Sequence, residues 1–339
     1  MRMKHRFYGR PSSRLLCGLA WFVMASALTA QVVPFPDFAD PADKTARAQY
    51  LAGNFVQAEA LYSAAWKARP NDAEVAYVLG RLAAHREDWT LAVQFLAQAI
   101  KLQPEIMQSY LYYSQAFGEI MRNANIFEVG GKVAEFKAFI DNAAMLFPNE
   151  PDILQLVIQF HINAPGILGG NRETAHQLLP RLKALSDSMG LRLEAMLADV
   201  EGHQDQTNNL FAQSASHGQA RTYLAWVAWL VKHQRGAEAQ QLLMENRNKV
   251  DRPELMRFLL GRLSADTNSH AAEGLAALDD YLSLDWRPDT PTKAEAWFQK
   301  ARILLAIGRK TEASQAIRES TMELPGVKRY QDLLKSLGG

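Results

Sequence analysis

Few side chains in this sequence stand at spacings that would support catalysis. The nearest approach to a phosphate-binding loop is the segment 129–132, Val-Gly-Gly-Lys. The leading glycine of a P-loop is absent there, and Val133 stands where a Ser or Thr would bind magnesium. No Gly-x-Ser-x-Gly segment supplies a nucleophilic serine. The sequence therefore gives no support for nucleotide chemistry or for serine hydrolysis.

The histidines do not form a metal site by spacing either. His161 and His176 lie on either side of a Gly-Gly pair, with no carboxylate or second histidine at ligand spacing. His270 and Glu273 make half of a metal-binding motif that has no partner. We therefore predict no metal, no cofactor and no enzymatic activity, and we expect these histidines to be ordinary surface or partly buried residues.

The most regular feature of the chain is a spacing of small and apolar residues over 73–105. Its fixed points are the pair Leu79-Gly80, then Ala92, Leu96 and Ala99, with Pro104 at the end. A small residue lets two helices approach closely, and leucines at i, i+3 and i+4 lie on one helix face. Proline ends a helix because it cannot donate the next hydrogen bond. The pattern predicts two packed helices joined by a polar turn at 86–88.

This pattern resembles the tetratricopeptide repeat (TPR) family, whose repeat is a helix–turn–helix of about 34 residues. Pro70 and Pro104 are 34 residues apart and set the register. The resemblance implies an all-α, right-handed superhelical solenoid that occupies 39–339 as a single domain of about eight helical hairpins. A final helix over 328–337 would cover the last apolar face. The expected units are 39–72, 73–105, 107–148, a fourth that contains 163–171, 187–219, 220–253, 254–287 and 294–327.

Two segments interrupt the repeat. The segment 123–132 contains Asn-Ala-Asn and Gly-Gly, and Pro148 follows Pro104 by 44 residues, so we expect an inserted loop of about ten residues. The segment 163–171 contains one proline and three glycines and predicts a second loop. Insertions in solenoids emerge on one face, which is often the binding face. The copy at 187–219 is the least regular, and the sequence leaves open whether it is a true repeat or a helix pair at another angle.

The resemblance also implies which residues face the groove. In this family the first helix of each repeat lines the concave side, and its ninth residue points inward. That register gives Arg47, Arg81, Gln115, Ala228, Arg262 and Arg302. Arginine presents a planar fork that suits carboxylates and phosphates. The Lys and Asn pairing of the family's peptide-carboxylate clamp is absent, so two readings stay open. The arginines bind a partner, or they are solvated or paired with neighbouring acids.

Aromatic residues gather near the same helices. They are Tyr77, Tyr110 and Tyr113 in the early units and Trp226, Trp229 and Trp297 in the later ones. Such residues fill the core, or they anchor a bound chain. We take Tyr77 with Arg47, Arg81, Gln115, Arg262 and Arg302 as the candidate partner-binding set.

The N-terminus has the three-part plan of a secretory signal peptide. Residues 1–14 carry five basic side chains and no acid, and 15–28 are almost wholly apolar. Cleavage is expected after Ala27 or Ala30. An uncleaved segment that anchors the chain in the inner membrane is the alternative. The next residues, 31–38, contain Pro34 and Pro36 and predict an extended lead-in.

Charge and cysteine content narrow the function further. The chain has 37 basic and 36 acidic side chains, and removal of residues 1–30 leaves 32 and 36, a formal charge of −4. This argues against nucleic-acid binding, which favours a basic surface. The single cysteine, Cys17, lies inside the signal segment, so the mature chain forms no disulfide. Arg14 stands where a lipoprotein signal would have leucine, which argues against lipidation.

These observations predict a bacterial exported TPR protein of the periplasm or the secreted fraction. We expect a non-enzymatic scaffold or adaptor of the cell envelope that holds a protein or peptide segment in its concave groove, with no stable membrane span after cleavage. The alternative is a transport-associated periplasmic protein that binds a small molecule or lipid in a cavity. An enclosed apolar cavity would favour transport, and an open solvated groove would favour the peptide.

Overall fold

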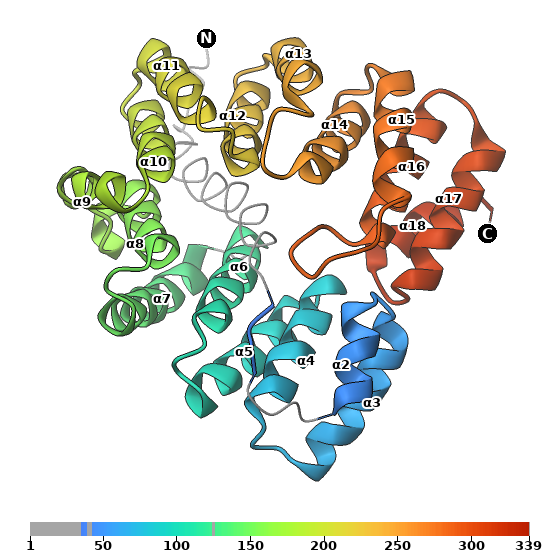
Figure 1. Ribbon diagram of the computed structural model, residues 1–339, viewed down its shortest axis with the longest axis horizontal. Helices are drawn as coiled ribbons and strands as arrows, with labels where there is room; N and C mark the ends of the chain where they lie inside the picture. The colour runs from blue at the N-terminus through green and yellow to red at the C-terminus, as the bar shows by residue number, and fades with distance from the viewer. Residues whose placement is uncertain (1–34, 39–42, 124–125, 339) are drawn as a thin grey trace, which may run out of the picture.

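Helices pack in consecutive antiparallel pairs throughout the structure, a computed structural model that describes residues 35–38, 43–123 and 126–338 (Figure 1). These residues contain seventeen α-helices, one short 3-10 turn and no strand. We call each pair a unit and number the units along the chain. The pairs are α2 (Lys44–Leu51) with α3 (Phe55–Ala68), α4 (Ala73–His85) with α5 (Trp89–Leu102), α6 (Met107–Asn123) with α7 (Ile126–Leu146), α8 (Pro151–Asn163) with α9 (Arg172–Leu185), α10 (Asp187–Val200) with α11 (Gln204–Ala215), α12 (Ala220–Lys232) with α13 (Gly236–Asn246), α14 (Pro253–Thr267) with α15 (Ala271–Leu282), and α16 (Lys293–Ala306) with α17 (Lys310–Glu323). A last helix, α18 (Lys328–Ser336), packs on α17.

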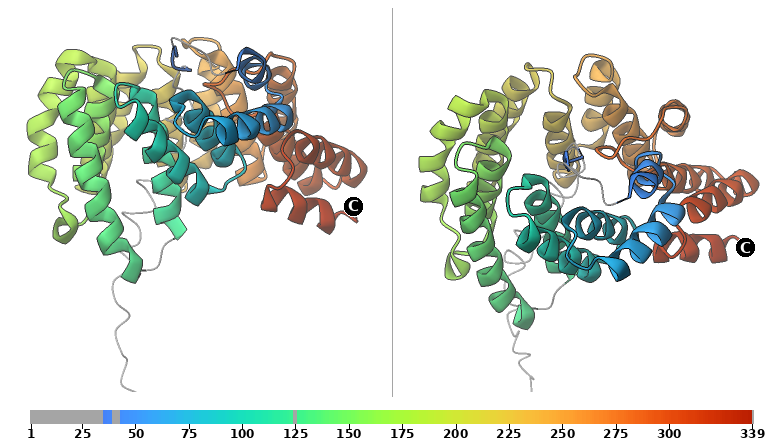
Figure 2. Two further views of the ribbon diagram at one scale, coloured as in Figure 1. Left: turned by 90° about the horizontal axis from the view of Figure 1, so that it is seen from below. Right: turned by 60° about the horizontal axis from the view of Figure 1, so that its bottom comes forward.

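The units follow a curved path that turns almost a full circle (Figure 1). Helices α8, α10, α12 and α14 lie on the inner side of this path, and α9, α11 and α13 lie outside. The last units return beside the first, as the second view of Figure 2 also shows. The predicted all-α solenoid is confirmed, but its groove is bent into a ring.

Side-chain caps explain where several helices begin. Asp72 Oδ1 accepts a hydrogen bond from the backbone N–H of Val75 at the start of α4. Asp88 Oδ1 does the same for Leu91 at the start of α5. Such caps satisfy N–H groups that have no partner within the helix. Local sequence therefore sets the polar turn at 86–88 between the two helices of unit 2.

The small residue of the repeat lies where the two helices of a unit cross. A Cβ placed on Gly80 would be 2.7 Å from Leu96 Cγ. The same pair of residue types meets in unit 7, where a Cβ on Gly261 would be 2.2 Å from Leu278 Cγ. No side chain fits at these distances, so glycine permits the close crossing that the spacing predicts.

The loop predicted at 123–132 is wrong. Helix α6 runs to Asn123 and α7 begins at Ile126, so 126–132 is helical. The additional residues lengthen both helices, which have 17 and 21 residues, against 13 and 14 in unit 2. Glycine within a helix costs only about 1 kcal/mol, and the surrounding Glu, Lys and Ala residues favour helix. The Gly-Gly pair therefore lies within α7 and does not break it.

The second interruption is a loop. Residues 164–171 separate α8 from α9 and contain the 3-10 turn η2 (Gly166–Leu168). Asn171 Oδ1 accepts from the backbone N–H of Thr174 and caps α9. In the irregular copy at 187–219, helices α10 and α11 pack on each other as in other units, and α10 also contacts α8 and α12. Its two helices therefore pair with each other and with the neighbouring units, as the helices of the other units do.

The predicted signal peptide, its cleavage sites and Cys17 lie outside the described residues. Of the lead-in, residues 35–38 are described and are not helical, and Phe35 and Phe38 pack against Tyr77. Across the described ranges, no helix has the length and apolar character needed to cross a bilayer. The same residues contain no group of His, Cys, Asp and Glu suited to a metal ion.

Candidate functional site at the closure of the ring

The ring closes through contacts between units 1 and 2 and the last two units. Arg329 Nε on α18 donates to Glu87 Oε1, in the turn after α4, at 2.6 Å. Arg81 Nη2 on α4 donates to the carbonyl of Pro288 at 2.7 Å. One apolar core cluster includes side chains from both ends of the chain, from Tyr50 to Tyr330. We call this region the seam.

A pocket of about 420 Å³ lies at the inner side of the seam. Its walls come from both ends of the chain, because α4 and α6 form one side and α14, α16 and α18 form the other. Five arginines and four acids line it, together with several aromatic rings. The charged lining residues are Arg81, Arg122, Arg262, Arg302, Arg329, Glu87, Glu119, Asp266 and Glu295.

The structure brings four of the six candidate residues into this pocket. Arg81, Gln115, Arg262 and Arg302 all line it, although they come from units 2, 3, 7 and 8. The inward register of the family therefore picks out residues that lie close together in the structure. They meet because distant units contact each other at the seam, which the sequence did not predict.

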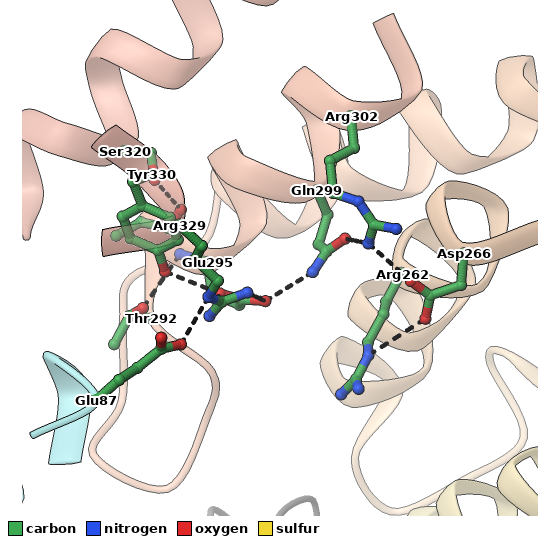
Figure 3. Close-up of polar contacts among 11 residues, drawn as sticks. Glu87, Arg262, Asp266, Thr292, Glu295, Gln299, Arg302, Ser320, Arg329 and Tyr330 are labelled. Atoms are coloured by element: carbon green, nitrogen blue, oxygen red, sulfur yellow. Dashed lines mark hydrogen bonds and ion pairs between the residues drawn. The ribbon is translucent and has the colours of Figure 1, made fainter. Parts of the chain in front are cut away.

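A chain of hydrogen bonds and ion pairs crosses the pocket wall (Figure 3). Its centre is the Glu295 carboxylate, which accepts from Arg329 Nη2 at 2.5 Å and from Gln299 Nε2 at 2.7 Å. Gln299 Oε1 in turn accepts from Arg302 Nη1 at 2.7 Å. Arg302 Nη1 also donates to Asp266, at 2.7 Å. These hydrogen bonds and ion pairs fix the positions of most charged groups on the pocket wall that α14, α16 and α18 form.

Neighbouring charges keep Glu295 ionised. Burial raises the pKa of this carboxyl, but Arg329 and the hydrogen bonds from Arg329, Tyr330 and Gln299 lower it more, so the net pKa lies below the ordinary value. Glu119 has the opposite balance, because burial raises its pKa more than Arg122 lowers it. The two acids therefore differ in how firmly they hold their charge.

Arg262 and Arg302 share one acid. Asp266 lies 2.7 Å from Arg302 Nη1 and 3.6 Å from Arg262 Nε. Both arginine side chains are about one-third exposed, at 35% and 33%. Two guanidinium groups face this one carboxylate and are partly accessible, and a guanidinium suits an anionic group of a ligand.

Arg81 has only neutral partners. Its guanidinium lies 3.6 Å from the centre of the Tyr112 ring, donates to Tyr77 Oη at 3.0 Å, and donates to the Pro288 carbonyl. The residue is 2% exposed. A buried guanidinium over an aromatic face is stabilised by cation–π attraction. Arg81 therefore lies in the pocket wall and does not project from it as a free side chain.

The two remaining candidates lie elsewhere. Arg47 pairs with Glu74, with Nε and Nη2 each 2.7 Å from a carboxylate oxygen, which fits the reading of arginines paired with neighbouring acids. Tyr77 is fully buried beneath Arg81. The other early tyrosines and Trp229 also pack in the core, so their main role is packing.

Several residues of the pocket and of the seam had no signal in the sequence. Glu87 and Arg329 are 242 positions apart and meet only because the ring closes. Trp286 stands alone in a polar linker, and yet it packs against unit 1. A tryptophan in a linker was the one available hint, because so large an apolar side chain is seldom left without a contact.

The comparisons with known proteins agree with this architecture. A family model described as tetratricopeptide repeat matches residues 49–112. This range extends from the end of α2 into α6 and covers the whole of unit 2. No curated protein sequence matches the chain.

Several solved structures match most of the length of this chain. Yeast Tom70 has 18% identity and a TM-score of 0.53, and the match covers 93% of this chain and 68% of that one. A TPR protein from Parabacteroides merdae has 13% identity and a TM-score of 0.41, with 88% and 98% covered. The TPR domain of P58(IPK) has 12% identity and a TM-score of 0.29, with 87% and 96% covered. The likeness to Tom70 shows a shared fold, and no enzyme family is indicated.

Proposed function

We propose that this chain is a non-enzymatic protein-binding scaffold that holds a peptide segment of a partner in the pocket at the seam. TPR-type folds are typical of protein–protein interaction. The observation that carries the proposal is the convergence of Arg81, Gln115, Arg262 and Arg302 on one pocket. Its volume of about 420 Å³ lies within the range of roughly 300–1,000 Å³ found for ligand sites.

The charged lining supports a peptide more than a lipid. Nine charged side chains surround the pocket, and hydrocarbon would displace their water without offering them a hydrogen bond. A peptide offers carboxylates and main-chain amides that can replace the contacts of Arg262 and Arg302. The signal-like residues 1–30 favour an envelope protein as the partner.

The test begins with peptides displayed on phage and selected on the full chain. Selected peptides should bind the R262Q/R302Q variant about tenfold more weakly than wild type, because a charge-assisted hydrogen bond contributes about 1.5–3 kcal/mol. Isothermal titration calorimetry measures the affinity. We choose these arginines because they are partly exposed, whereas loss of the buried Arg81 would also disturb the seam.

The matched control is R309Q. Arg309 pairs with Glu312 on α17 and does not line the pocket. Equal weakening by R309Q and by R262Q/R302Q would assign the effect to general surface charge. Unchanged binding of every selected peptide by R262Q/R302Q would remove the pocket from the proposed function.

A further inference from the structure

The segment 283–292, which we call the closing loop, contacts units 1 and 2 across the seam. It joins α15 to α16 and reaches from the last units towards α4 (Figure 1). It contains no regular helix or strand. Its contacts with units 1 and 2 involve one large side chain and one main-chain carbonyl.

The large side chain is Trp286. Its ring centroid lies 4.9 Å from that of Phe55, 5.8 Å from Tyr50 and 6.1 Å from His85. Gly53 completes this surface, since a Cβ placed there would lie 3.4 Å from Trp286 Cε3. Its φ of +79° is one that glycine adopts readily. We call Tyr50, Gly53, Phe55 and His85 the aromatic socket.

The carbonyl belongs to Pro288, two residues after Trp286. It accepts the 2.7 Å hydrogen bond from Arg81 Nη2. The closing loop thus places an aromatic side chain in the aromatic socket and offers a main-chain acceptor to the buried Arg81. An aromatic anchor beside an arginine contact is the arrangement found at the centres of protein interfaces.

The fit of the loop in the socket is incomplete. Trp286 Nε1, Tyr50 Oη and His85 Nε2 are buried and have no hydrogen-bond partner among the described residues. Leaving a buried polar group unpaired costs about 1–3 kcal/mol. A segment that brought a hydrogen-bonding group to Tyr50 Oη or His85 Nε2 would remove part of this cost. The socket therefore offers hydrogen bonds that the closing loop leaves unused.

Release of the loop would keep the contacts within each helix pair. In a solenoid each unit is stabilised mainly by its neighbours, so opening the seam would remove the contacts across it, including those of the shared apolar core cluster, and leave the helix pairs packed. Opening would also separate the two walls of the pocket described above. Occupancy of the socket and the shape of the pocket are coupled through Arg81, which contacts the loop and lines the pocket.

We propose that the aromatic socket is a docking surface for a peptide segment that carries an aromatic residue followed two positions later by a free carbonyl acceptor, and that the closing loop is its intramolecular competitor. The biological use of this surface rests on the proposed peptide binding. The competition itself is measurable without a natural partner. A tethered loop has an effective concentration in the millimolar range, so it masks the socket against weak ligands.

The experiment uses a fluorescent synthetic peptide of residues 283–292 and the full chain. Fluorescence anisotropy should show binding to the W286A variant at least tenfold tighter than to wild type, since W286A vacates the socket. A peptide in which alanine replaces the tryptophan should not bind W286A. The control variant W297A, in which the lost tryptophan lies on α16 outside the socket, should bind no better than wild type.

A second variant covers the case in which W286A does not fold. E87Q removes the charge that pairs with Arg329 across the seam and leaves the socket intact. It should raise peptide affinity about two- to fivefold. Equal binding by wild type, W286A and E87Q, or equal binding of the peptide without tryptophan, would overturn the proposal. If phage-selected peptides still depended on Arg262 and Arg302, the proposed function would survive that result.

Discussion

At the residue scale, the charged side chains that reduce the stability of the fold most are those that are buried. Arg192 on α10 is 1% exposed, donates from Nη2 to Gln155 at 2.5 Å, and has no partner at Nη1. Burial, with Arg221 nearby, lowers the pKa of Arg192 to about 10. Glu323 at the end of α17 is a second costly group, because burial raises its pKa to about 7.

The pKa of Glu323 predicts a pH dependence of stability. The native carboxyl holds its proton up to about pH 7, whereas the unfolded one releases it near the ordinary pKa of 4.5. The contribution of Glu323 to the free energy of unfolding is therefore most favourable below pH 4.5, and it is lost as the pH rises through 7. The E323Q variant should therefore be more stable than wild type at pH 8, by roughly 1–2 kcal/mol after allowance for solvent screening of a partly exposed group.

Urea denaturation of wild type and E323Q at pH 5 and pH 8 measures this difference. The difference should be much smaller at pH 5 than at pH 8, because native Glu323 is still protonated at pH 5 and only a small part of the contribution has been lost there. A difference of the same size at both pH values would show that the substitution acts through packing and not through ionisation.

At the element scale, the helix pairs follow from local sequence and the interruption in unit 3 does not. Leu79-Gly80 and Leu96 specify their own crossing within one unit, so it could be predicted. The Gly-Gly pair at 130–131 has two possible meanings in sequence, a turn or a tolerated position within a helix. The apolar faces of α6 and α7 decide for the helix, because their aromatic rings stack on one another, as Phe117 and Phe136 do at 4.6 Å.

Two glycines in helices should respond to alanine in opposite directions. Gly131 in α7 is exposed, and a Cβ there would have no heavy atom within 4 Å. G131A should stabilise the chain by about 0.5–1 kcal/mol because alanine favours helix. G80A should destabilise it by about 1–3 kcal/mol, because Leu96 occupies the space.

Thermal unfolding followed by circular dichroism compares the two variants with wild type. A loss of stability in G131A would mean that 126–132 is not the regular helix described above. An unchanged midpoint in G80A would contradict the close crossing of α4 and α5.

At the scale of the whole molecule, closure of the ring is the feature that sequence could not reveal. Curvature arises from a small rotation at each unit, and these rotations add up along eight units. A local sequence pattern describes one unit and not the total rotation, so the pairing of Glu87 with Arg329 was not predictable. The inward register was predictable, and it brought Arg262 and Arg302 into the candidate set before the pocket was known.

The central claim is that a partner segment lies in the pocket at the seam. The most direct measurement places a photo-crosslinking amino acid at position 84, where an alanine lines the pocket, or at position 309, outside it, in the full chain made in its native cells. This leaves the pocket arginines in place. Mass spectrometry then identifies crosslinked peptides. We expect one recurrent segment of one protein at position 84 and none at 309. Equal crosslinking at both positions, or recurrent crosslinks only at 309, would contradict the claim.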